Sequence, residues 1–102
     1  MNTSPETIAR SYRAEPHALF GACLTALGTT QARIERHDIE RGLIVARAGQ
    51  GWLAPASEIT LRIGPAGSGM AQVAASMRPL RRGGDPRFLP ALLQLIDGML
   101  QV

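Results

Sequence analysis

The chain has 102 residues, of which 45% are apolar and 19% are charged, so it encodes a folded domain rather than a disordered segment. This length closes one modest core and leaves no room for a cofactor domain beside a substrate domain. We therefore expect a single α+β domain over residues 1–102, with residues 1–6 as a flexible N-terminus. No window resembles the roughly 20 apolar residues of a membrane span, and the first residues lack the layout of a signal peptide. These absences predict a cytoplasmic protein.

The net charge is +3, and all 11 basic residues are arginines. An arginine-only basic set fits a GC-rich coding bias as well as it fits selection for arginine chemistry. The acidic residues are spread along the chain, so a mixed, solvated surface is the default interpretation. The excess positive charge still favours weak attraction to anions.

The N-terminal part predicts a strand followed by a helix. Residues 7–13 alternate, with Ile8 and Tyr12 on one side, which favours a short strand. A helix that Ser4 caps, with Pro5 at its first position, is the alternative. Residues 16–27 then predict a helix that Gly28 closes in the left-handed conformation.

The helix predicted over residues 16–27 has two unlike faces. One face is an apolar arc at helical spacing, made of Leu19, Phe20, Cys23, Leu24 and Leu27. The opposite face has small or uncharged side chains, namely Ala18, Gly21, Ala22 and Thr25. A surface helix normally carries charges there, so we expect the second helix or another subunit to cover this face.

Four more strands are predicted from alternating or continuous apolar patterns, over residues 32–37, 43–48, 58–63 and 70–78. The segment 43–48 is apolar throughout, which is typical of a central strand. Polar or glycine-containing turns and loops separate the strands, over residues 38–42, 49–57 and 64–69. Short connections between successive strands indicate an antiparallel meander.

The last element is a helix over residues 85–100, with Asp85 as its cap and Pro86 at its first position. Pro90 removes a backbone donor, so we expect either a kink or a true start nearer Leu89. The element order is strand, helix, four strands, helix. An antiparallel sheet of about five strands with two helices on one face is the α+β arrangement that buries these patterns most simply. Its last helix offers a continuous apolar arc to the sheet, made of Phe88, Leu89, Leu92, Leu93, Leu95, Ile96, Met99 and Leu100.

The residues that could carry catalysis or bind metal are few and scattered. His17 and His37 are the only histidines, and Asp38 follows His37 on a strand, where adjacent side chains point to opposite faces. Cys23 belongs to the apolar arc, and a zinc site needs three or four ligands. The glycines of residues 64–69 precede a strand, whereas a phosphate loop precedes a helix. We therefore expect no catalytic constellation, no metal and no cofactor.

Two sets of residues are candidates for binding. Trp52 lies among glycines in a loop, where it is either a binding anchor or a plug over one end of the core. A small apolar ligand or a partner would be bound by Trp52, Phe20, Phe88 and Leu92. An anion would dock beside the start of the last helix, at Arg78, Arg81, Arg82 and Arg87. Only 4% of residues are aromatic, which argues against nucleic acid bound by base stacking and leaves an electrostatic binder open.

Two short stretches resemble known families. Residues 12–20 contain Glu15-Pro16-x-x-Leu19-Phe20, which resembles the strand-to-helix entry of the helix-grip fold of the polyketide-cyclase and lipid-transfer superfamily. This resemblance implies a cavity for an apolar ligand between sheet and helices. The segment Ala75-Ser76-Met77-Arg78, followed by Gly84-Asp85, resembles an uncharacterised bacterial family in which a Ser-x-Ser-Arg strand end precedes Gly-x-x-Asp and a last helix. Here the second serine is replaced and the Gly-to-Asp spacing differs.

These observations favour a non-enzymatic binding or protein-interaction domain that self-associates as a homodimer. The helix-grip variant of this hypothesis adds a small apolar ligand. The alternative is an arginine-driven nucleic-acid or anion binder. An enzyme that uses His37 or the Arg78–Arg87 region is the third hypothesis, which the absence of a catalytic constellation disfavours.

Overall fold

The computed structural model describes residues 6–49, 57–80 and 87–100. Trp52, Arg81, Arg82, Asp85 and Pro86, which the sequence singles out, lie outside these ranges. The described residues form five strands and two helices in the predicted order, so the predicted α+β class is confirmed. The elements are β1 (Glu6–Tyr12), α1 (Pro16–Thr29), β2 (Arg33–Asp38), β3 (Leu43–Ala48), β4 (Ser57–Gly67), β5 (Met70–Pro79) and α2 (Phe88–Leu100).

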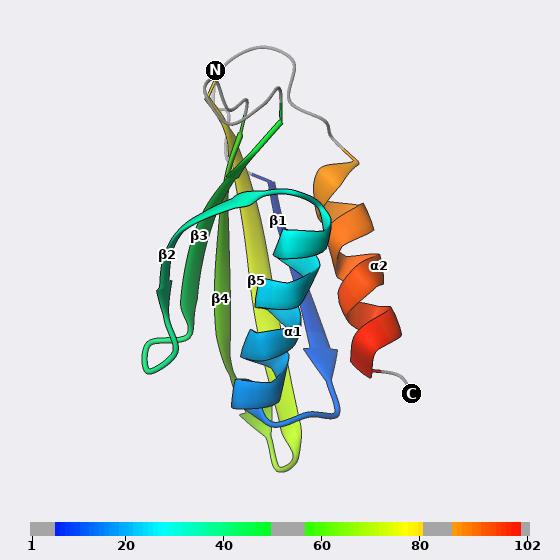
Figure 1. The fold of residues 1–102 in the computed structure, drawn as a ribbon. Helices are drawn as coiled ribbons and strands as arrows, with labels where there is room; N and C mark the ends of the chain where they lie inside the picture. The colour runs from blue at the N-terminus through cyan, green and yellow to red at the C-terminus, as the bar shows by residue number, and fades with distance from the viewer. Residues whose placement is uncertain (1–5, 50–56, 81–86, 101–102) are drawn as a thin grey trace.

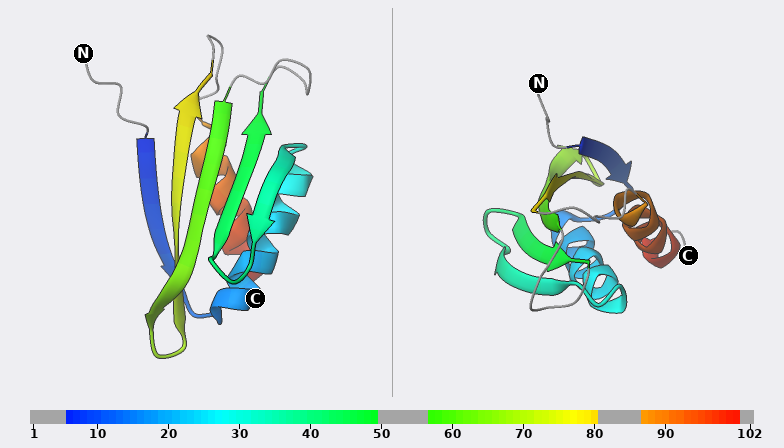
Figure 2. Two further views of the ribbon diagram at one scale, coloured as in Figure 1. Left: turned by 90° about the vertical axis from the view of Figure 1, so that its left-hand side faces the viewer. Right: turned by 90° about the horizontal axis from the view of Figure 1, so that it is seen from above.

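The five strands form one antiparallel sheet in the order β1-β5-β4-β3-β2, with β1 and β2 at its edges (Figure 2). Strands β2 to β5 form the expected meander, and β1 returns to pair with β5, with Ile8 opposite Ala75. The strand predicted over residues 7–13 is therefore confirmed, and its helical alternative is wrong. Pairing of the first and last strands places Glu6, the first described residue, opposite Met77 near the end of β5.

Both helices cover the same face of the sheet and run antiparallel to each other (Figure 1). Alternate residues of β3, β4 and β5, such as Ile44, Leu61 and Val73, are fully buried and point toward the helices. The helices contribute the other half of the core, namely Leu19, Phe20, Cys23, Ala26, Leu27, Leu89, Leu92, Leu93 and Ile96. The opposite face of the sheet carries no helix among the described residues (Figure 2, left).

Helix α1 is longer than its sequence pattern predicts. Gly28 lies inside the helix rather than after it, and the left-handed residue is Gln31, with φ of 62°. The Ala32 amide donates to the Leu27 carbonyl and the Gln31 amide donates to the Gly28 carbonyl, both at 3.1 Å, which is the Schellman termination. The prediction for Gly28 was wrong because these two hydrogen bonds, rather than a glycine, end the helix.

Strand β4 also runs further than predicted, because it extends through residues 64–67 of the supposed turn. Only Ser68 and Gly69 separate it from β5. Beyond Ile63 the neighbouring strand β3 has no residue left to pair, so β4 is bonded on one side alone. Pro65, which has no N–H, is tolerated at such an edge, where it lies opposite Ala71.

Gly42, in the turn between β2 and β3, is required by the close approach of β4. Its φ is 65°, and its carbonyl accepts a hydrogen bond of 2.7 Å from the Ile63 amide. A Cβ atom at Gly42 would lie 1.9 Å from the Ile63 carbonyl oxygen. Any other residue would push the turn away from β4.

Helix α2 begins at Phe88, close to the later of the two predicted starts. Pro90 is its third residue, and the amides of a first turn have no helical acceptor, so the expected kink is unnecessary. Neither of the two helices has the length and apolar character to cross a membrane.

Candidate interaction surfaces

The outward surface of the two helices, which we call the helical face, is almost free of charge. The 14 residues of α1 include no Asp, Glu or Arg, and the 13 residues of α2 include Asp97 alone. Ten residues of these helices are exposed, and none is an acid or an arginine: His17, Ala18, Gly21, Thr25, Gly28, Thr29, Pro90, Ala91, Gln94 and Gly98. The face predicted to be uncharged on α1 therefore continues across α2.

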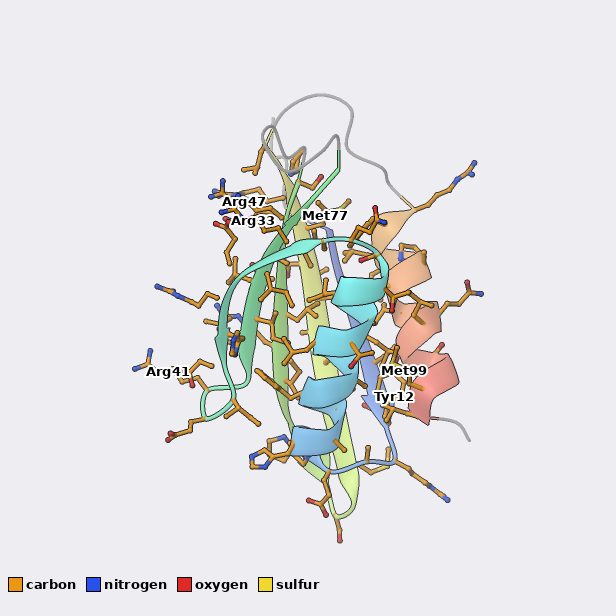
Figure 3. All side chains as sticks on the ribbon, in the orientation of Figure 1. Tyr12, Arg33, Arg41, Arg47, Met77 and Met99 are labelled. Atoms are coloured by element: carbon orange, nitrogen blue, oxygen red, sulfur yellow. The ribbon has the colours of Figure 1, made fainter. Side chains whose placement is uncertain are left out.

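Asp97 does not contribute a free charge, because it is engaged by β1. Arg10 Nη1 donates to Asp97 Oδ2 at 2.5 Å, and the Tyr12 hydroxyl donates to Asp97 Oδ1 at 2.6 Å. Tyr12 is buried in the core, against which Met99 of α2 also packs (Figure 3). Burial, and then the hydrogen bond to Asp97, raise the pKa of Tyr12 well above its usual range, so the phenol is a permanent donor here.

The small residues of the helical face have no evident role within the described chain. A Cβ atom placed on Gly21, Gly28 or Gly98 would meet nothing within 4 Å. Each glycine inside a helix costs about 0.5–1 kcal/mol relative to alanine. The hydroxyls of Thr25 and Thr29 donate to the carbonyls of Gly21 and Thr25, at 3.1 and 3.0 Å, so their polar atoms are already satisfied. The side chains of the helical face are thus short, and another molecule can cover this face without breaking these hydrogen bonds.

The opposite side of the sheet, which we call the open sheet face, carries the charges. Arg33 on β2 lies directly opposite Arg47 on β3 (Figure 3), and Arg47 lies opposite Glu58 on β4. Glu35 lies 3.4 Å from the Nε atoms of both Arg33 and Arg47, which offsets the repulsion between the two guanidinium groups. Glu58 accepts a hydrogen bond of 3.1 Å from Arg78 on β5. One row of the sheet therefore holds Arg33, Arg47, Glu58 and Arg78, with Glu35 beside its first two arginines.

The next row of the open sheet face is polar but mostly uncharged. The registers place Arg36, Val45, Thr60, Ser76 and Thr7 side by side across all five strands. The hydroxyl oxygens of Thr7 and Ser76 are 3.2 Å apart. The following row crosses β4 at Arg62, which is exposed.

The predicted ligand residues are spread over different environments. Phe20 and Leu92 are core residues with 3% and 0% of their surface exposed, so they present nothing to a protein partner. Phe88 is half-buried and, with Met77, lines a cavity of about 20 Å³ at one end of the core. That volume holds about one water molecule, and it is too small for an apolar ligand.

The predicted anion site is described only in part, since Arg81 and Arg82 lie outside the described residues. Arg78 points from the open sheet face and pairs with Glu58. Arg87 is exposed directly before the first turn of α2. The structure thus places Arg78 with the other sheet arginines rather than alone in a loop.

The candidate reactive residues occupy ordinary positions. His17 and His37 are exposed, and Asp38 accepts hydrogen bonds from the amides of Glu40 and Arg41 in the β2–β3 turn. Cys23 is fully buried, and burial raises the pKa of its thiol to about 12. Within residues 6–49, 57–80 and 87–100, no three acidic, histidine or cysteine side chains gather as metal ligands.

Sequence reasoning missed the two polar clusters. The contact of Asp97 with Arg10 and Tyr12 joins residues 85 or more positions apart, and no local pattern announces it. A signal existed for the open sheet face, since Arg47, Glu58, Thr60 and Arg62 all alternate with buried residues on predicted strands. No family model and no curated protein matches this chain.

Proposed function

We propose that this protein is a non-enzymatic, cytoplasmic interaction module that self-associates through its helical face. The observation that carries this proposal is the lack of any free charge over the outward surface of both helices. A helix that stays in water normally presents charged side chains on its solvent side. Charged residues are depleted from the core of protein–protein interfaces.

A second copy of the chain is the occupant that fits this face. A two-fold interface sets the same patch against itself, so an uncharged face meets an uncharged face and no ion is desolvated without a partner. A partner with a charged surface would lose hydration with nothing to replace it. Gly21, Gly28 and Gly98 allow the helices of the two copies to approach closely.

The size of the face limits the strength of the dimer. A helix of 14 residues is about 21 Å long, and two adjacent helices are about 20 Å wide. This footprint is smaller than the roughly 800 Å² per partner of a standard stable interface. We therefore expect a weak, reversible dimer that forms in the micromolar to millimolar range.

The apolar-ligand form of the hypothesis, suggested by the resemblance to helix-grip proteins, has less support. Its candidate residues Phe20 and Leu92 already fill the core, and the cavity beside Phe88 is of water size. Self-association needs no such cavity.

Sedimentation equilibrium of the Gly21→Arg variant tests the proposal. The wild-type weight-average mass should rise toward that of a dimer with concentration, and the variant should remain a monomer. Arginine favours a helix by about 1 kcal/mol over glycine, and its Cβ meets nothing within 4 Å. The variant should therefore unfold at a higher temperature than the wild type, which separates loss of the dimer from loss of the fold.

Two controls sharpen this experiment. Gly21→Ala keeps the face uncharged and small, so it should retain the dimer. Gln72→Arg adds the same charge to the open sheet face, where Gln72 is exposed on β5, and should also retain it. A wild-type chain that stays monomeric at millimolar concentration would overturn the proposal, as would equal loss of the dimer in Gln72→Arg.

A further inference from the structure

The open sheet face has a separate chemistry, and we infer that it binds the phosphate backbone of double-stranded nucleic acid. The inference does not depend on the helical face. Among the described residues this face carries five arginines, Arg33, Arg36, Arg47, Arg62 and Arg78, and three carboxylates, Glu35, Asp38 and Glu58.

The arginine side chains of the row that holds Arg33, Arg47 and Arg78 are more exposed than the carboxylates with which they pair. The side chains of Arg33 and Arg78 are 58% and 62% exposed, whereas those of their partners Glu35 and Glu58 are 31% and 23% exposed. An approaching anion therefore meets guanidinium groups first. Arginine also presents several N–H donors in a geometry that matches phosphate oxygens.

Arg36 and Arg62 are the arginines best placed to accept a new partner. Both are exposed, and neither has a carboxylate within salt-bridge distance among the described residues. Arg36 lies opposite Val45, and Arg62 lies between Leu43 and Ala74, so the residues directly opposite them on the adjacent strands are uncharged. Binding an anion here would break no ion pair.

Hydroxyl groups lie between the row of Arg47 and Arg78 and the position of Arg62. Thr60 and Ser76 are opposite each other on β4 and β5, and Thr7 follows Ser76 on β1. Hydroxyls are common donors to phosphate and sugar oxygens, which set the register of a protein on a duplex. The open sheet face therefore carries hydroxyl hydrogen-bond donors between its arginines as well as the guanidinium donors themselves.

The distance between Arg62 and the row of Arg33, Arg47 and Arg78 favours a duplex. Glu58, which lies in that row, is four residues from Arg62 on β4. At about 3.4 Å per residue the row and Arg62 are about 14 Å apart. The major groove of a duplex is about 12 Å wide, so Arg62 and the arginines of the row can reach the phosphates on its two sides. The face has no aromatic residue on its described strands, and a single strand would have no surface on which to stack.

Fluorescence anisotropy with a labelled duplex of mixed sequence tests the inference. At low salt the wild type should bind, and the logarithm of the affinity should fall linearly as the logarithm of the salt concentration rises. The Arg36→Gln/Arg62→Gln variant should weaken binding and lower that slope by about 2, close to 1 for each phosphate contact removed. Neither side chain makes a described ion pair, so the variant should melt at the wild-type temperature.

A matched control separates a site from net charge. Arg62→Gln and Arg13→Gln each remove one positive charge, and Arg13 is exposed beyond the end of β1, the edge strand on the opposite side of the sheet from Arg36 on β2. Only Arg62→Gln should weaken binding. Three results would overturn the inference: no binding at low salt, equal weakening by Arg13→Gln, or tighter binding of a single strand of the same sequence than of the duplex.

Discussion

The two broad surfaces of this protein treat charge in opposite ways. The helical face carries no free charge, whereas the open sheet face carries a cross-strand row of arginines and carboxylates. In a two-layer α+β domain both surfaces face water, so both would ordinarily carry charge. The contrast shows that burial in the core does not determine the composition of the helical face. The proposed association with another copy would require such a face to be free of charge.

The largest loss of stability should come from substitution of a residue on the side of the helices that faces the sheet. Leu92→Ala removes a fully buried side chain between α2 and the sheet and leaves a cavity, so we expect a loss of about 2–5 kcal/mol in the free energy of unfolding. Chemical denaturation measures it. Thr60→Ala, on the open sheet face, should change stability by less than about 1 kcal/mol. Similar losses in both variants would remove the distinction between the two sides of the sheet.

The next largest loss of stability should follow substitution of Asp97, the one charged residue of the two helices. Asp97→Ala leaves the buried Tyr12 hydroxyl without its acceptor, and we expect a loss of about 1–3 kcal/mol. Tyr12→Phe in the Asp97→Ala background should cost less than Tyr12→Phe in the wild type, which a double-mutant cycle measures. Additive losses would mean that Asp97 and Tyr12 do not stabilise each other.

Alkaline pH tests the same contact without a change at Asp97. The pKa of Tyr12 is raised in the folded state, so the folded protein keeps the phenol protonated while the unfolded chain ionises. Stability from this group is full below about pH 10 and falls as pH rises further. The decline in melting temperature above this pH should be smaller in Tyr12→Phe than in the wild type. An equal decline in both proteins would assign it to other groups.

The smallest effect is expected on the open sheet face. Glu58→Gln removes the partner of Arg78, an exposed pair, so the loss should be below about 1 kcal/mol and should shrink with added salt. The same variant should strengthen duplex binding, because it removes a carboxylate that lies between Arg47 and Arg78. Weaker duplex binding would contradict the role that we infer for this face.

The sequence predicted the elements better than it predicted their ends. Alternation at Ile59, Leu61 and Ile63 sufficed for β4, because one side of a strand must be buried. The ends of α1 and β4 depend on hydrogen bonds of Gln31 and on pairing beyond Ile63, which composition does not reveal. Gly28 and residues 64–67 look like turn residues in isolation, and tertiary context overrides that preference.

For a related reason, the sequence predicted the uncharged face of α1 but not the arginines of the open sheet face. The uncharged face of α1 follows from one helix alone, since helical spacing places Ala18, Gly21 and Thr25 together. The row of Arg33, Arg47 and Arg78 depends on the strand order, which brings residues of three strands to one face. Local spacing instead suggested a cluster of Arg78 with the loop arginines that follow it.

A two-dimensional NMR dilution series tests the central claim most directly, because it reads both surfaces of the same sample. If the helical face is where copies meet, amide signals of Ala18, Gly21, Thr25, Gln94 and Gly98 should shift with concentration, and those of Val45, Thr60 and Gln72 should stay in place. Signals that shift only on the open sheet face, or that shift nowhere up to millimolar concentration, would contradict the account.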